Sequence, residues 1–382
     1  MDLLNLGAKL KTRTKAYCQA PNLCDQLDKD QLRCIGTAVW EGYQSDLQSR
    51  SAWERRTNAA MDLAMQVQQA KTFPWPNASN VVFPLITIAA LQFSARAYTN
   101  LIQGTDVVRY RVATPDEGGQ LIARAKRIGA HMSWQVLEED EAWEEQHDKL
   151  LINLAVVGVA FIKTYWSAEL RHNVSELVPA RYLVVDYWAK SIETAARVTQ
   201  VLQLSRNQVH SRVASDMYVD ITKEDWYVKP AVTPAQAEYE SKTSADKRAG
   251  VSPPAGSDAS TPFTFLEQHC YLDLDGDGYA EPYIVVIEFG SHRVVRIVAR
   301  WEKPEDVLTN GSDIVSIRTT HYFTKYGFIP SPDGGFYDMG FGLFLGGFLL
   351  EGRPLEHPIA RHDLTTVAPR GELEREQLVE RR

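Results

Sequence analysis

Apolar residues recur at three- and four-residue steps along much of the first 160 positions, the spacing typical of amphipathic helices. This pattern predicts helices at 28–50, 51–70, 80–103, 119–139 and 148–157. Leu32, Ile35, Val39, Tyr43 and Leu47 line the first apolar face. We expect the first two helices to pack on each other and on the third.

The helix at 80–103 follows a rigid lead-in, Phe73-Pro74-Trp75-Pro76, that cannot be helical. We expect Asn80 to be its N-cap and Pro84 to fall in the first turn, where the missing N–H has no intrahelical partner. Apolar residues then recur along one face, at Val82, Ile86, Ala89, Phe93, Ala97 and Leu101. This face predicts a buried helix.

Strand-like apolar runs begin near residue 106 and return throughout the second half of the chain. They predict strands at 106–113, 159–166, 170–178, 180–188, 196–204, 263–272, 282–289, 294–299 and 316–323. Gly158 ends a helix, and Ser205 is expected to cap a short one that runs to Ala214. The runs after residue 262 are close in sequence and indicate an antiparallel meander.

These elements predict an α+β fold, with N-terminal helices and a mixed β wing followed by an antiparallel β meander. The expected organisation is a polar arm at 1–27, a helical and β wing region at 28–228, a flexible linker or loop at 229–262, a β meander with the start of a core helix at 263–348, and an atypical, disordered tail at 349–382. The linker is rich in Pro, Ala, Ser and Lys, and is expected to separate two ordered parts.

The turn between the strands at 263–272 and 282–289 is acidic. Asp273, Asp275, Asp277 and Gly278 match the first half of an EF-hand calcium loop. Ile284 replaces the bidentate Glu at the last loop position, and the flanks are strands, so an EF-hand is excluded. Asp273, Asp275, Asp277 and Glu281 remain candidates for a looser calcium site, and an unliganded acidic turn is the alternative.

Composition and charge argue against a membrane-spanning protein and against one that binds nucleic acid tightly. The 382 residues are 44% apolar with a net charge of −8, and no apolar run is long enough to span a membrane. The negative charge argues against a protein that grips nucleic acid. The four cysteines, at positions 18, 24, 34 and 270, lack zinc-site spacing and are expected to be free thiols. The six carboxylates within 138–145 are expected to form a solvated helix face near a break.

A glycine-rich stretch, 328–342, precedes another apolar helix start at Leu343. It contains neither a Walker A sequence nor G-x-G-x-x-G, so it does not predict nucleotide binding. Four stretches, at 73–103, 150–166, 265–290 and 320–345, resemble segments of the portal proteins of tailed bacteriophages, in the same order along the chain. The likeness extends over roughly residues 40–348, and in that family the step from helix through glycine to strand builds the wing.

The resemblance implies a structural, non-enzymatic subunit without a cofactor, in a ring of twelve copies at a capsid vertex. Its expected partners are other copies of itself, the large terminase, head-completion or tail adaptor proteins, capsid or scaffold protein, and double-stranded DNA that passes without sequence-specific binding. It also implies assembly in the host bacterial cytoplasm and a place in the virion, without a membrane.

Two alternatives remain open: a metal-dependent hydrolase or nuclease built on the acidic turn and 138–145, and another head-tail connector component. Portal proteins are commonly longer, and the composition changes abruptly after Leu350. We therefore hypothesise a C-terminally truncated portal with an unrelated, frame-shifted tail.

Overall fold

The protein, seen here as a computed structural model, has an α+β fold of helices and antiparallel sheets. The structure describes residues 17, 20–67, 84–102, 104, 107–116, 118–168, 170–224, 227, 246, 249–251, 261–274, 278–310 and 313–350. Among the helices it describes, none has the length and apolar character needed to cross a bilayer. Most of the expected arm, most of the linker and nearly all of the tail lie outside the described residues. The described end of the arm, 20–27, is not a polar arm, because Leu23 and Cys24 are buried in the core.

The helices among the described residues are α2 (Lys29–Ser49), α3 (Ser51–Ala64), α4 (Leu85–Leu101), α5 (Gln120–Trp134), α6 (Trp143–Val157), α7 (Arg206–Ala214) and α10 (Phe341–Leu350). Short turns of other helix types are η1 (Cys24–Gln26), η2 (Gln135–Glu139), η3 (Ala180–Tyr182) and η4 (Pro304–Asp306), of which η2 is a π-helix. The predicted cap is confirmed at Ser205, whose side chain accepts from the backbone N–H of Gln208. Asp28 caps α2 in the same way, through the backbone N–H of Gln31.

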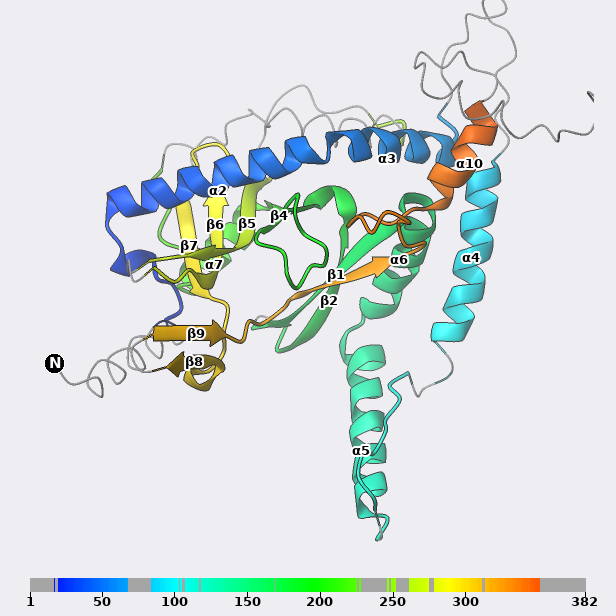
Figure 1. The fold of residues 1–382 in the computed structure, drawn as a ribbon, viewed down its shortest axis with the longest axis horizontal. Helices are drawn as coiled ribbons and strands as arrows, with labels where there is room; N and C mark the ends of the chain where they lie inside the picture. Colours follow the sequence, from blue (N-terminus) through cyan, green and yellow to red (C-terminus); the bar gives the residue numbers. More distant parts are fainter. Residues whose placement is uncertain are drawn as a thin grey trace, which may run out of the picture.

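The first two helices do not pack on each other, contrary to expectation. α2 and α3 follow one another almost in line, with a break at Arg50 (Figure 1). The predicted apolar face of α2 is confirmed, with Val39 and Tyr43 in the core against the five-stranded sheet. α3 instead packs on α4, α6 and α10. One helical line therefore spans two parts of the molecule.

Within the described residues the strands form three antiparallel sheets. Their bounds are β1 (Val159–Ser167), β2 (His172–Pro179), β3 (Leu183–Val185), β4 (Val198–Leu204), β5 (Phe263–Leu272), β6 (Glu281–Glu288), β7 (Val294–Ala299), β8 (Val307–Asn310), β9 (Asp313–Ile317) and β10 (Phe323–Gly327). The sheet orders are β10-β1-β2, β3-β4-β5-β6-β7 and β8-β9. The predicted meander is confirmed as β5-β6-β7.

The two ordered parts on either side of 229–262 share these sheets. β4 pairs with β5, with Val198 opposite His269, and β1 pairs with β10, with Val159 opposite Gly327. The predicted strand at 316–323 is wrong as one element, because β9 ends at Ile317 and β10 begins at Phe323 in a different sheet. The chain therefore crosses between sheets at 318–322.

α4 and α6 lie side by side, and α5 extends away from them (Figure 1). The predicted N-cap Asn80 lies outside the described residues, and α4 itself begins at Leu85 after Pro84. The expectation that this helix is buried holds for one face only, because Leu101 is exposed. The predicted strand at 106–113 is wrong within its described part, 107–113. This segment lies along α5, where the Val108 N–H donates to the Ser133 hydroxyl at 3.1 Å.

Candidate functional site

The predicted calcium ligands are only partly described. Asp275 and Asp277 lie outside the described residues, and Asp273 accepts a hydrogen bond from the Gly278 N–H at 3.0 Å within the turn. Glu281 is fully buried at the start of β6, where the Tyr283 hydroxyl donates to its carboxylate at 3.2 Å. Within the described part of the chain, no three His, Cys, Asp or Glu side chains gather as a metal site would require.

The acidic segment 138–145 is mostly solvated, as predicted, with one exception. Glu138, Glu141, Glu144 and Glu145 are exposed. Asp140 is buried at the end of η2 and accepts from the Ser175 N–H at 3.0 Å, which fixes this helix break to β2. Sequence spacing contains no signal that separates Asp140 from its exposed neighbours.

The glycine-rich stretch 328–342 crosses the junction of α6 and β1 at very short range. A Cβ on Gly340 would lie 2.5 Å from the Val156 carbonyl oxygen and 2.6 Å from the Gly158 nitrogen. Gly158 itself has φ 99°, a backbone conformation that residues with a side chain rarely adopt. The Phe328 N–H donates to the Gly158 carbonyl at 2.9 Å, and Ile329 forms an isolated antiparallel β-bridge with Met339. Close backbone packing therefore explains Gly158 and Gly340.

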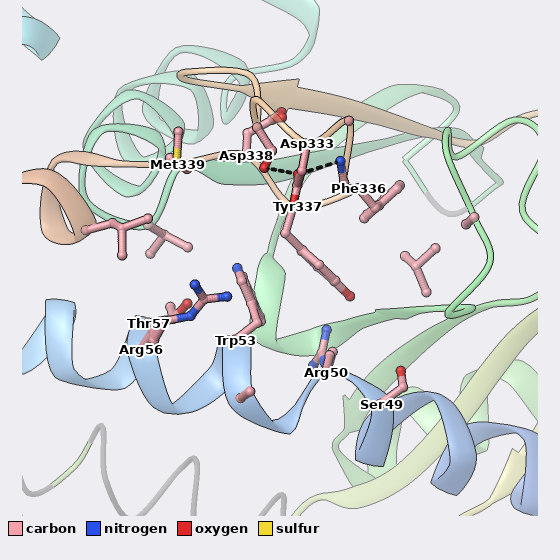
Figure 2. Close-up of a pocket in the computed structure, with 18 of the residues that line it drawn as sticks. Ser49, Arg50, Trp53, Arg56, Thr57, Asp333, Phe336, Tyr337, Asp338 and Met339 are labelled. Carbon is pink, nitrogen blue, oxygen red and sulfur yellow. Dashed lines mark hydrogen bonds between the residues drawn. The ribbon is translucent and has the colours of Figure 1, made fainter. Parts of the chain in front are cut away.

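This loop forms one side of a pocket of about 860 Å³, whose other sides are α3 and the segment 185–190. Figure 2 shows Tyr337 extending from the loop toward α3, where its ring stacks on Trp53 with centroids 4.3 Å apart. Arg50, at the break between α2 and α3, is buried and donates to the carbonyls of Ala180 and Leu183 at 2.9 and 2.6 Å. It also pairs with Glu54 at 2.8 Å. Its guanidinium is thus used to hold the pocket together.

A second group of buried charges joins two sheets. Lys163 of β1 donates to Glu267 of β5 at 2.6 Å and to Gln200 of β4 at 2.9 Å. Burial favours the neutral form of Glu267, but Lys163 and His269 outweigh it and hold its pKa well below the usual range. Burial lowers the pKa of His269 to about 4, so the ring is neutral near pH 7. Residue spacing gives no sign of this group, because Lys163 and Glu267 lie in different sheets and their side chains meet only where the two sheets come together.

Arg197 makes a comparable link between α2 and the five-stranded sheet. It donates two hydrogen bonds to Asp46, at 2.7 and 3.0 Å, and one to Asp186 at 3.2 Å. Cys24, Cys34 and Cys270 are free thiols, as predicted, and burial raises the pKa of Cys24 and Cys270 to about 12. Cys18 lies outside the described residues.

Among the exposed large apolar side chains of the described residues, several lie on α5, on α4 and beside the pocket. On α5, Leu121, Ile128 and Met132 are 41%, 48% and 45% exposed. On α4, Leu91 is 54% exposed, and Trp188 beside the pocket is 82% exposed. Helical spacing identified the apolar positions of α4 and α5, but it did not indicate that these faces stay open.

No family model matches the chain, and no curated protein matches it either.

Proposed function

We propose that this chain is a structural portal subunit, which associates with copies of itself in a ring at a capsid vertex through which DNA is packaged and ejected. In this proposal the ring is a dodecamer and not an enzyme. It docks the large terminase, then head-completion or tail adaptor proteins, and contacts capsid or scaffold protein. Double-stranded DNA passes through it without sequence-specific binding. The sequence resemblance at 73–103, 150–166, 265–290 and 320–345 supplies the identity of the assembly.

The observation that supports self-association is the exposure of α5. This 15-residue helix extends from the body (Figure 1), and only Gly129 and Ser133 within it are buried. Isolated helices of about this length are marginal in water, and most helical stability in proteins comes from packing. Exposed apolar rows are typical of surfaces that bind another protein. A neighbouring subunit would cover this one.

Three cations that link separate elements support a structural role in the same way. Arg50, Arg197 and Lys163 each connect separate elements through hydrogen bonds to carbonyls or carboxylates. Their donors hold the α2–α3 break, α2 and β1 in place. Each of these charges is therefore accounted for by the fold.

Light scattering coupled to size exclusion, followed by electron microscopy of the main peak, tests the proposal. We expect ring particles of about twelve subunits, the number implied by the resemblance. A monomer that cleaves DNA only with a divalent cation would instead support the metal-dependent nuclease. A closed ring that binds neither capsid protein nor terminase would support another head-tail connector.

A further inference from the structure

We infer that α5 of one copy docks on the outer face of α4 in the next copy, where acidic residues of α6 border it. This inference rests on the proposed self-association and specifies the two surfaces that meet. A second copy of this chain covers each of the two surfaces.

The first surface is an apolar row on α5. Leu121, Ala125, Ile128 and Met132 are spaced by four, three and four residues, so they lie along one side of the helix. A different side of α5 contacts the 107–116 segment, because Gly129 lies against the Tyr110 ring. The row itself is therefore left open.

This surface carries a positive charge although the chain is acidic overall. We call residues 107–116 and 118–134 the α5 projection. Five basic residues and one carboxylate occur in it: Arg109, Arg111, Arg124, Lys126, Arg127 and Asp116. All five basic residues are exposed.

The second surface is the outer face of α4. Ile88, Leu91 and Ala95 are exposed at helical spacing, whereas Ile86, Ala90 and Ser94 are buried on the opposite side. The bordering helix α6 presents Glu144, which accepts from the Tyr98 hydroxyl of α4, and Asp148, which accepts from the Ser94 hydroxyl at 3.4 Å. An open apolar row thus has carboxylates along one edge.

The second surface lies beside a segment of negative charge. Residues 135–149 contain seven carboxylates and one lysine, of which Asp140 is buried and Lys149 pairs with Glu145. The exposed carboxylates are Glu138, Glu141, Glu144, Glu145 and Asp148. An apolar row beside basic residues and an apolar row beside acidic residues are complementary in both respects.

A contact between two different surfaces is heterologous. When two copies associate in this way, the pair still has one free α5 surface and one free α4 surface. Such contacts build a ring when the rotation between neighbours closes, and an open filament when it does not. α5 extends away from α4 of its own chain (Figure 1), so its row is left for a neighbour. Nucleic acid fits this surface less well, because an apolar row offers nothing to phosphates.

Charge reversal with rescue tests the docking. Two double variants are made. Arg124→Glu/Arg127→Glu makes both surfaces acidic, and Glu141→Lys/Glu144→Lys makes both surfaces basic, so each places like charges opposite each other. Each pair is expected to raise the concentration at half-assembly by about tenfold or more in sedimentation velocity. The four changes together are expected to restore assembly to within about threefold of the parent. Lys190→Glu/Lys223→Glu, at two exposed lysines outside both surfaces, is the control with the same charge change and should leave assembly unaltered.

Cross-linking provides a measurement that does not depend on charge. In a background with Cys18 and Cys34 replaced by serine, Met132→Cys/Leu91→Cys is expected to give disulfide-linked oligomers, and either change alone only dimers at most. Rings that form normally in every charge variant and do not cross-link would overturn the docking and leave the proposed function standing. A parent chain that stays monomeric at all concentrations would overturn both. If Arg124→Glu/Arg127→Glu no longer binds double-stranded DNA that the parent binds, while its assembly is unchanged, the α5 projection is a nucleic-acid surface and the docking is overturned.

Discussion

The backbones of Gly158 and Gly340 meet so closely that neither position has room for a side chain. A Cβ on Gly340 would lie 2.6 Å from the Gly158 nitrogen, and a Cβ on Gly158 would overlap the Gly340 nitrogen. The contact joins the end of α6 to the start of α10, which are far apart in the sequence. It positions the pocket loop and the helix that packs on α3.

Gly340→Ala is expected to lower the free energy of unfolding by about 1–3 kcal/mol, the range for overpacking a tight contact. The reason is that the groups in its way are backbone atoms of Val156 and Gly158, which cannot rotate aside. Denaturant unfolding of the parent and the variant measures the effect. Gly118→Ala is the matched control, because its Cβ would meet only Gln120 Cγ, at 3.9 Å. Equal stability of the two variants would contradict the close contact.

Calcium is expected to leave the melting temperature of the protein unchanged and to give no heat in a calorimetric titration. Glu281 is buried and accepts from Tyr283, so reaching a cation in the turn would require that hydrogen bond to break. A rise in melting temperature that Asp275→Asn abolishes would show instead that the turn binds calcium. Magnesium is the matched control, since its smaller octahedral shell suits a different geometry.

Local chemistry predicted much of the fold. Asp28, Ser205 and Gly158 mark element ends in the structure as their capping and backbone preferences imply. The strands at 263–272 and 294–299 also have the predicted bounds. These features depend on residues within one element.

The failures depend on distant residues. The apolar alternation at 107–113 is compatible with a strand, but this segment lies against α5 instead of pairing. Two sheets contain strands from both before and after residues 229–262. Their pairing could not be predicted, because β4 and β5 pair residues about 70 apart in the sequence. The same is true of the candidate site: Lys163 and Glu267 belong to different sheets, and no spacing rule relates them.

Breaking the ion pair between Lys163 and Glu267 is expected to be costly. Lys163→Met leaves a buried carboxylate without its cation, and loss of one partner of a buried pair typically costs about 3–5 kcal/mol of unfolding free energy. Lys163→Met/Glu267→Gln should recover part of this loss, because the uncompensated charge is gone. Lys149→Met, which breaks the exposed pair with Glu145, is the control and should cost much less stability, because exposed ion pairs contribute little. If the two lysine variants lose equal stability, the buried pair does not hold the sheets together.

His269 predicts a specific dependence of stability on pH. Burial lowers its folded pKa to about 4 from an ordinary value of 6.5, so the unfolded chain binds the proton more readily between these values. Its contribution is therefore complete above pH 6.5 and is lost as the pH falls toward 4, by about 3 kcal/mol in all. His269→Gln is expected to flatten the unfolding free energy over this window, as measured by denaturant titration at several pH values. His210→Gln, at an exposed position, should keep the parent slope. A His269→Gln profile as steep as that of the parent would show that another group titrates in this range.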